Sequence, residues 1–344
     1  IFYLGGSTMG KVRMIDIAQK VGVSAVTVHN ALTGKKGVSD DIREEIKKVA
    51  NEMGYQQSQG LKLSDGERFI NVGVIISEKF LDDYDTFYWR IYQEIALAAD
   101  EKQCMVTVDV LKKNMEDYNI LPRSVINNAV DAIIIIGELS HDYIKFIKSQ
   151  VSIPIVFLDF YDKDIADNAV VTDNFYGMYI LTEYLFENGF NNIAYVGSIH
   201  STSSIMDRYC GYYKAIIQHG ATLRDDWIIE DRDAEGSRIE LKIPSHMPEA
   251  FVCNCDMIAD ILIEDLKNLG YRIPEDISVV GFDNFLATGN KNDNITTYEV
   301  NMKAMAKVAL NKVLKQIKKP GAARGLDIVA GHIVEKSTVK KLNK

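Results

Sequence analysis

The chain has 344 residues, a formal net charge of −9, 47% hydrophobic residues and 25% charged residues. This composition predicts a folded protein, and the length exceeds what one hydrophobic core supports, so we expect two large lobes and a small additional domain. The acidic balance excludes a general nucleic-acid coat protein. No apolar run approaches the length of a membrane span, so we expect no membrane partner.

The first residues, Ile1 to Thr8, contain no methionine, and we expect the natural start at Met9. These residues are left out of the fold prediction, and no secretory signal is apparent. The few cysteines fit a reducing compartment, so we expect a cytoplasmic protein. Cys253 and Cys255 form a C-x-C pair, but no second pair stands at ligand spacing. The sequence therefore predicts no metal site and no cofactor.

Two short amphipathic helices are predicted between Ile15 and Leu32, on either side of Gly22. Gly22 can adopt the backbone angles that end one helix, and Ser24 is a good N-cap for the next. The outer face of the second helix is uncharged, whereas a solvated face usually carries Lys or Glu. The pattern is typical of a helix-turn-helix, whose second helix lies in the major groove of DNA, rather than of a helical hairpin that only packs.

The N-terminal part is mildly basic, unlike the rest of the chain. Residues 10–63 contain nine Lys or Arg against six Asp or Glu, which leaves −12 for the remainder. Lys35 and Lys36 stand in the loop after the second helix, where they can meet phosphates. A third helix, capped by Ser39 or Asp40, completes the head. A cationic head on an acidic body favours specific DNA binding, because the body repels phosphate.

Beyond a polar linker at 55–66, strands alternate with helices. The first series is strand 70–76, helix 88–99, strand 106–111, helix 115–129, strand 132–136, helix 143–148 and strand 155–160. The second series is helix 176–188, strand 193–197, helix 208–219, strands 227–230 and 250–253, helix 256–269, strand 277–282, helix 302–317 and strand 327–335. This alternation predicts two lobes with parallel sheets covered by helices. Ligands of such sheets lie off the carboxyl ends of the strands, so a cleft between the lobes is expected.

Several phrases of the chain are similar to those of one family of bacterial transcription regulators. They include DIAQKVGVSAVTVHNALTGKKGVSDD, VVTDNFYGMYILTEYLFENGF, DRYCGYYKA, GYRIPEDISVVGFDN, NITT and VEKST. On these phrases the chain resembles the LacI/GalR (lactose-repressor) family, from about Val12 to Thr338. Several independent phrases in the right order are a far more specific signal than one short motif.

The resemblance implies an architecture and a partner. The fold class is an N-terminal three-helix helix-turn-helix head followed by two tandem doubly wound parallel α/β lobes, like those of periplasmic binding proteins. The expected boundaries are 10–54 for the head, 55–68 for the hinge, 69–165 plus about 291–319 for the first effector-binding lobe, and 166–290 plus about 320–340 for the second. The family pairs two-fold, which implies a homodimer on a pseudo-palindromic operator of double-stranded DNA.

The resemblance places the base-reading positions on Ala25, Val26 and Asn30. Alanine and valine offer apolar contact, for instance to a thymine methyl, and Asn30 can pair with both edge groups of an adenine. The family more often has Ser-Arg or Ser-His at positions 29–30, so we expect an operator that differs from the common one. The residues expected to be phosphate contacts or caps are Ser24, Thr27 and His29.

The hinge departs from the family pattern, which is a Pro-Asn turn and a short helix whose leucine wedges into the minor groove. Here Gln57-Ser58 occupies the turn, Ser64 stands at the leucine position, and Gly60 weakens the helix. Leu61 or Leu63 can substitute in a shifted register. A flexible linker without wedging is an equally good interpretation.

The effector residues implied by the resemblance are Phe87, Tyr88, Asp159, Phe160, Thr202, Ser204, Arg208 and Asp283. Two carboxylates and a guanidinium among aromatic rings can hold the hydroxyl groups of a polyol by charge-assisted hydrogen bonds. Phe87 or Tyr88 can instead belong to the core, and the two aspartates can instead cap turns. Arg208 opens a predicted helix, where a cation opposes the helix dipole unless it has another task.

The sequence therefore predicts a transcriptional regulator, a repressor, that responds to a small molecule such as a sugar. A sugar-binding transport protein shares the two-lobed body, but the head and the missing signal peptide oppose that alternative. No G-x-S-x-G, P-loop or His-Glu metal pattern is present, so we expect no enzyme and no catalytic residues. No heptad tail follows Thr338, which favours a dimer over a tetramer.

Overall fold

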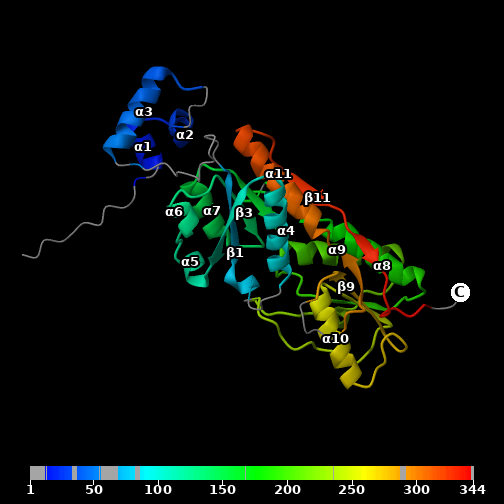
Figure 1. Cartoon of the computed structure of the whole chain (residues 1–344). Coiled ribbons are helices and arrows are strands. Elements are labelled where there is room, and N and C mark those ends of the chain that lie inside the picture. Colours follow the sequence, from blue (N-terminus) through cyan, green and yellow to red (C-terminus); the bar gives the residue numbers. More distant parts are fainter. Residues whose placement is uncertain are drawn as a thin grey trace, which may run out of the picture.

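The structure, a computed structural model, describes residues 12, 14–32, 37–53, 55, 69–81, 86–166, 168–234, 236–286 and 292–341. They form a small helical head and a body of two α/β lobes (Figure 1). Within these ranges, no helix combines the length and the apolar character needed to cross a bilayer. Met9, Lys35, Lys36 and the hinge residues 56–68 lie outside the described residues, so the predictions made for them stay predictions.

Three short helices make the head: α1 (Met14–Val21), α2 (Ala25–Leu32) and α3 (Asp40–Glu52). Gly22 has φ +77°, a conformation that glycine adopts without strain and that ends α1. Ser24 caps α2, because its Oγ accepts a hydrogen bond of 3.1 Å from the backbone N–H of Thr27. All three helices close on one core, whose fully buried members include Ile17, Val28 and Ile46.

The first lobe is built on a parallel six-stranded sheet of order β11-β5-β4-β3-β1-β2. Its strands are β1 (Asn71–Ser77), β2 (Met105–Leu111), β3 (Ala132–Ile136), β4 (Ile155–Leu158), β5 (Ala169–Thr172) and β11 (Leu326–Val329). Neighbouring residues of β1 face opposite sides, so Val74 packs in one core and Ile75 in the other. One face is covered by α4 (Phe87–Glu101) and α11 (Met302–Lys318); the other by α5 (Lys113–Asp117), α6 (Arg123–Ile126) and α7 (His141–Gln150).

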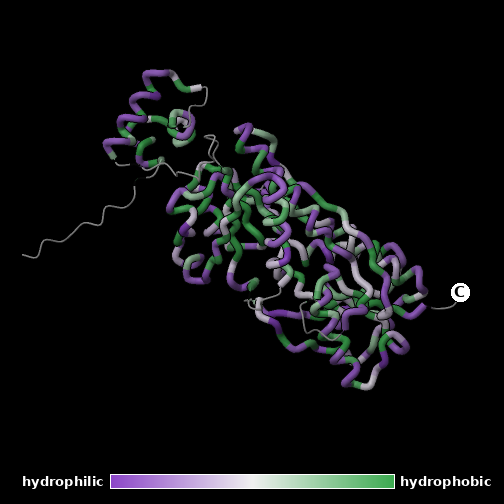
Figure 2. Tube along the Cα trace, in the orientation of Figure 1, coloured by the Kyte–Doolittle hydropathy of each residue, from purple (hydrophilic) through white to green (hydrophobic). Residues whose placement is uncertain are grey.

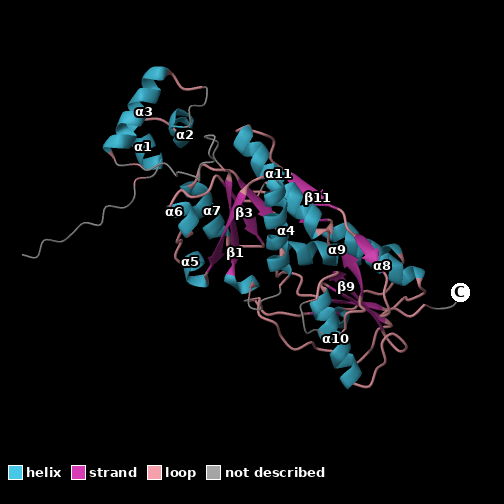
Figure 3. Cartoon of the chain, viewed as in Figure 1, coloured by secondary structure: helices cyan, strands magenta, loops and turns pink. Residues whose placement is uncertain are grey.

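The second lobe repeats this plan, with sheet order β12-β10-β9-β8-β6-β7 and only β12 antiparallel to its neighbour. Its strands are β6 (Ile193–Val196), β7 (Ile228–Ile229), β8 (Ala250–Cys253), β9 (Ser278–Asp283), β10 (Thr296–Glu299) and β12 (His332–Val334). The helices α8 (Asn174–Glu187) and α9 (Ser203–Gln218) cover one face, and α10 (Asp256–Asn268) covers the other. Short 3-10 turns lie at Glu78–Phe80 and Asp225–Trp227. Figure 3 shows the two groups of strands, and Figure 2 shows hydrophobic residues gathered inside both lobes.

The strand pairing corrects the predicted division of the chain between the lobes. β5 lies in the first sheet, although the prediction places 166–290 in the second lobe, and β11 also lies in the first sheet. β10 lies in the second sheet, although the prediction places 291–319 in the first lobe. β5 and β10 are buried and β11 is an exposed edge strand, and the apolar pattern of a strand of four residues does not reveal which sheet it joins.

Two predicted elements are each divided in the structure. The helix predicted at 115–129 is two short helices, α5 and α6, because Pro122 stands between them and disfavours continued helix. The strand predicted at 327–335 is two strands in different sheets, β11 and β12, with Gly331 between them. A Cβ at Gly331 would lie 2.0 Å from the backbone oxygen of Glu299, so only glycine allows this crossing.

Replacing Gly211 by alanine is expected to destabilise the second lobe. Gly211 lies on α9 where that helix meets α8, and an added Cβ would stand 2.2 Å from the backbone oxygen of Phe175. Backbone of a helix cannot move aside like the end of a side chain, so we expect a loss of about 1–3 kcal/mol in the free energy of unfolding. Urea denaturation measures it. The exposed neighbour Cys210 supplies the control, since Cys210→Ala should leave stability nearly unchanged.

Candidate effector site and DNA-binding surface

Arg208 lies on the second turn of α9 and is only 5% exposed. Its Nε donates to Asn174 Oδ1 at 2.8 Å and its Nη1 donates to the backbone oxygen of Asn254 at 2.6 Å. Its Nη2 lies 3.1 Å from Asp283 Oδ1, and the guanidinium stacks 4.0 Å over the ring of Phe282. All three nitrogens are therefore used to fix one orientation of a buried cation.

Two aspartates stand at the carboxyl ends of central strands, one in each lobe. Asp159 follows β4, and Asp283 ends β9. Both have positive φ, +62° and +104°, which turns the chain sharply where the strand stops. Tyr88, on the first turn of α4, donates its hydroxyl to Asp159 Oδ2 at 3.0 Å. Four residues predicted from the resemblance thus meet between the lobes.

The lobes contact each other directly around this cluster. Tyr161 donates its hydroxyl to the carboxylate of Asp207 at 3.0 Å, and the backbone N–H of Ser203 donates to Glu138 Oε2 at 3.3 Å. Ser204 donates its hydroxyl to the backbone oxygen of Asp159 at 3.4 Å. Polar groups of one lobe therefore complete the hydrogen bonding of the other.

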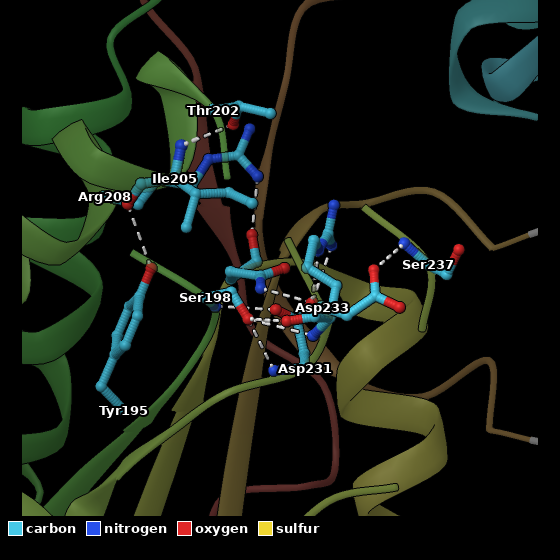
Figure 4. A network of polar contacts seen from close by, with 10 residues as sticks. Tyr195, Ser198, Thr202, Ile205, Arg208, Asp231, Asp233 and Ser237 are labelled. Carbon is cyan, nitrogen blue, oxygen red and sulfur yellow. Dashed lines mark hydrogen bonds and ion pairs between the residues drawn. The ribbon is translucent and has the colours of Figure 1, made fainter. Parts of the chain in front are cut away.

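A second network, absent from the predicted site, lies beside Arg208 (Figure 4). Asp231 is completely buried and accepts hydrogen bonds from the backbone of Ser198 and from Asn254 Nδ2. Arg232 donates two hydrogen bonds to the same carboxylate, from Nη2 at 2.7 Å and from Nε at 3.1 Å. The network fixes Asn254, whose backbone oxygen receives Arg208. The position of these residues in the sequence could have identified them. Asp231 directly follows the strand predicted at 227–230, and Asn254 directly follows the strand predicted at 250–253.

The remaining predicted effector residues differ in placement. Phe87 is half-buried and its ring centre lies 6.2 Å from that of Phe285 in the other lobe. Thr202 caps α9, with its Oγ1 accepting from the N–H of Ile205 at 3.2 Å. Phe160 packs in the first-lobe core against Phe157 and is 1% exposed. The structure thus places this ring in the core of the first lobe, and its role as an effector contact stays a prediction.

In the head, α2 presents an exposed face. Val26 is 54% exposed and Ser24 is also exposed. The other predicted DNA-contacting residues of α2 are half-buried: Ala25, Thr27, His29 and Asn30. Arg43 on α3 donates to the backbone oxygen atoms of Asn30 and Ala31, which ties the end of α2 to α3 and leaves the Asn30 amide group out of that contact. The surface suits a recognition helix held rigidly by its neighbours.

Comparison with known families assigns both parts of the chain. Residues 13–58 match the model described as bacterial regulatory proteins, lacI family, and residues 182–339 match a periplasmic binding protein-like domain. The chain therefore carries a LacI-family helix-turn-helix domain and a periplasmic-binding-protein-like domain. The predicted family, and the fold class of a helix-turn-helix head with two parallel α/β lobes, are thereby confirmed.

Relatives and solved structures extend the likeness over the whole chain. The HTH-type transcriptional repressors PurR of Vibrio campbellii and Vibrio vulnificus are 22% and 24% identical, each alignment covering 95% of this chain and 98% of the relative. The lac repressor dimer bound to operator and the anti-inducer ONPF has a TM-score of 0.63 at 20% identity, covering 95% of this chain and 99% of that one. A transcriptional regulator CelR–cellobiose complex has a TM-score of 0.65 at 17% identity, covering 95% and 100%. The chain therefore shares the fold of these regulators along nearly its whole length.

Burial dominates the electrostatics of the site. It raises the pKa of Asp159 and raises that of Asp283 to about 7, although the Arg208 guanidinium opposes both shifts. Burial and the adjacent carboxylate of Asp159 raise the pKa of Tyr88 well above its usual value. Tyr88 therefore stays a hydrogen-bond donor at neutral pH, while the two carboxyl groups hold protons more strongly than exposed ones.

Asp283 should make the protein less stable as the pH rises from about 4 to 7. Across this window the folded carboxyl keeps its proton while the unfolded one has lost it, so folding takes up protons. The charged and titratable groups that interact electrostatically with Asp283 are Arg208, Arg232, Asp159, Tyr88, Cys255 and Asp256. Asp283→Asn should flatten the dependence, measured as melting temperature at pH 5 to 8. Asp226→Asn is the control, because the exposed ion pair with Arg224 lowers the pKa of Asp226, away from this window. A wild-type curve that rises with pH, or an unaltered slope in the Asp283 variant, would contradict the prediction.

Proposed function

We propose that the chain is a transcriptional repressor that binds a pseudo-palindromic operator as a homodimer and responds to a small molecule, a sugar, held between its lobes. The observation that carries the proposal is the approach of the two lobes at this cluster: Ser204, one turn before Arg208 on α9, donates to the backbone oxygen of Asp159. Arg208 and Asp283 of the second lobe interact electrostatically with Asp159 and Tyr88 of the first. One ligand at this point touches both lobes, so its binding changes their relative arrangement. The same chain carries a helix-turn-helix head.

The proposed DNA contacts follow from the chemistry of α2. Ala25 and Val26 offer apolar contact to a thymine methyl, and the amide of Asn30 matches the acceptor and donor of adenine in the major groove. Ser24, Thr27, His29, Lys35 and Lys36 are the proposed phosphate contacts. A head of three short helices covers only one half-site, so two heads are needed for a specific operator. One structural neighbour, the lac repressor dimer bound to operator, supports this assembly.

The proposed effector contacts are Tyr88, Asp159, Arg208 and Asp283, with Phe87, Thr202 and Ser204 at the edge. Carboxylate oxygen atoms accept hydrogen bonds from hydroxyl groups, and aromatic rings pack on the apolar face of a sugar ring. The neighbour solved with cellobiose supports a sugar as the class of ligand. The cross-lobe hydrogen bonds of Tyr161 and Ser203 are the contacts that a ligand would strengthen or break. A ligand that binds one lobe arrangement more tightly shifts the population toward it.

Selection of binding sites by the full chain from random duplex DNA tests the DNA-binding half of the proposal. We expect enrichment of a two-fold symmetric sequence with half-sites about one helical turn apart. Binding to it should weaken steeply with salt, because each neutralised phosphate releases counterions. A pool without symmetry, or an affinity equal to that for random DNA, would contradict the proposal.

A further inference from the structure

Among the described residues of the effector site, more hydrogen-bond acceptors than hydrogen-bond donors lack a partner. Among the described residues, Asp159 Oδ1 and Asp283 Oδ1 accept no hydrogen bond, although the latter lies 3.1 Å from Arg208 Nη2 as an ion pair. Asp159 is only 6% exposed, so water does not readily replace the missing donor. One buried donor beside them, Nδ2 of Asn174, also lacks a partner within the described part of the chain. A ligand that completes this site must bring mainly N–H or O–H groups.

The two arginine side chains of the site, Arg208 and Arg232, are already paired with groups of the protein. Arg208 is bound through all three nitrogens to Asn174, Asn254 and Asp283. Arg232 is paired through two nitrogens with Asp231, which neutralises it. Asp159 and Asp283 therefore share the single charge of Arg208, which leaves one uncompensated negative charge when both are ionised. Burial is the main cause of the raised pKa of both carboxyl groups, and the charge of Asp159 raises the pKa of Asp283 further.

Among the described residues, none forms an ion pair with Asp159, and Asp283 pairs with Arg208 alone. The cross-lobe contacts of Asp207 and Glu138 are with a neutral tyrosine hydroxyl and a neutral backbone N–H, although Lys79 and His141 interact electrostatically with Glu138. A phosphorylated or carboxylated ligand would add a further negative charge with no free guanidinium to receive it. A buried charge without a partner costs several kcal/mol, so anionic ligands are disfavoured here.

We propose that the effector is a sugar or polyol bearing a protonated amine, with the ammonium group bound between Asp159 and Asp283. An ammonium group carries three donors on one atom and one positive charge, which match the unpaired Asp159 Oδ1, the Asp283 carboxylate that pairs with Arg208 alone, and the excess charge. The aromatic side chains of Tyr88 and Phe87 offer ring faces to the apolar side of the same molecule. This inference rests on the proposed function and specifies the ligand class of that same site.

Matched pairs of probes test the charge directly. The melting temperature of the full chain is measured at pH 7 with glucosamine, galactosamine and mannosamine, each against its parent hexose and its N-acetyl derivative, and with glucose 6-phosphate. A bound ligand raises the melting temperature by mass action. We expect at least one amino sugar to bind tenfold or more tightly than its neutral partners, and the phosphate to give no shift. Equal or stronger binding of a neutral sugar or of the phosphate, or no shift with any amine, would overturn the inference.

Variants localise the effect. Asp159→Asn and Asp283→Asn keep the size of each side chain but remove its charge, so each should reduce the preference for the amine over the parent sugar at least fivefold. Asp226→Asn, on the surface of the second lobe, should not change it. Calorimetry of the wild type in 50 and 500 mM NaCl gives a second readout that needs no variant: affinity for the amine should fall with salt and that for the parent sugar should not. If the preference for the amine is unchanged in both site variants, or if salt does not affect it, then Asp159 and Asp283 do not bind the ammonium group.

The outcomes separate this inference from the proposed function. If a neutral sugar binds preferentially and alters operator affinity, the inference fails and the proposed function stands. If an amino sugar binds through both aspartates but leaves operator affinity unchanged, the ligand class stands and the regulatory function fails.

Discussion

Arg208→Ala is expected to abolish the response to effector while operator binding survives. Arg208 holds Asp283 by an ion pair and is fixed by Asn174 and Asn254, so its loss removes the shared cation of the site. Removing one partner of a buried ion pair destabilises a protein by about 3–5 kcal/mol, so the lobes should also melt earlier. The head has its own core, and its reading of DNA does not depend on this side chain. Operator affinity with and without a stabilising ligand, measured by fluorescence anisotropy, checks the prediction.

Two further variants separate chemistry from stability. Arg208→Lys keeps a positive charge but loses the planar fork, so it should retain more of the fold and still lose most of the ligand response. Arg224→Ala removes an exposed arginine of the same lobe, paired with Asp226, and should behave as the wild type. A normal ligand titration in both Arg208 variants would remove this residue from the effector site.

Asn30→Ala is expected to weaken specific operator binding by about 1–3 kcal/mol and to relax the preference at one base pair of each half-site. The backbone oxygen of Asn30, which accepts from Arg43, is retained in the variant, so the position of α2 should not change. Non-specific binding, which depends on phosphate contacts, should stay the same. Anisotropy titrations against the selected operator and its single-base variants measure both effects.

Asn51→Ala serves as the matched control, since Asn51 is an exposed asparagine on α3 rather than α2. It should leave affinity and base preference unaltered. If Asn30→Ala behaves like this control, α2 does not read bases through Asn30 and the recognition face must be reassigned.

The sequence predicts the head well because its signals are local. Gly22 ends one helix and Ser24 begins the next, and both act through backbone angles and a hydrogen bond within three residues. Parallel strands in the body are also recognisable from alternating apolar runs and helices. Sheet membership is not recognisable in the same way, because β5, β10 and β11 are strands of only four residues. β5 and β10 each pair with the preceding strand, but their other partners, β11 and β12, lie far along the chain. Such pairing is set by topology, which composition does not encode.

The same distinction applies to the effector site. Arg208 is predicted from a helix expected to begin at it, where a cation opposes the helix dipole. The structure begins α9 at Ser203 and places Arg208 on the second turn, so its partners rather than the dipole account for its position. The structure places the ring of Phe160 in the first-lobe core, whereas the preceding Asp159 accepts a hydrogen bond from Tyr88, and the effector role of Phe160 stays a prediction. The sequence does not single out Asp231, Arg232 and Asn254, because their role depends on contacts between segments more than 20 residues apart. They nevertheless directly follow strands, which is where ligand sites of α/β sheets form.

The central claim is that the polar cluster between the lobes controls the DNA-reading head. Its most direct measurement is the dissociation constant of the full chain for its selected operator, with and without a saturating ligand that raises the melting temperature. We expect the constant to change at least about fivefold, the lower range of coupling between distinct sites. An unchanged constant at saturating ligand would contradict the claim, since binding between the lobes would then have no connection to the head.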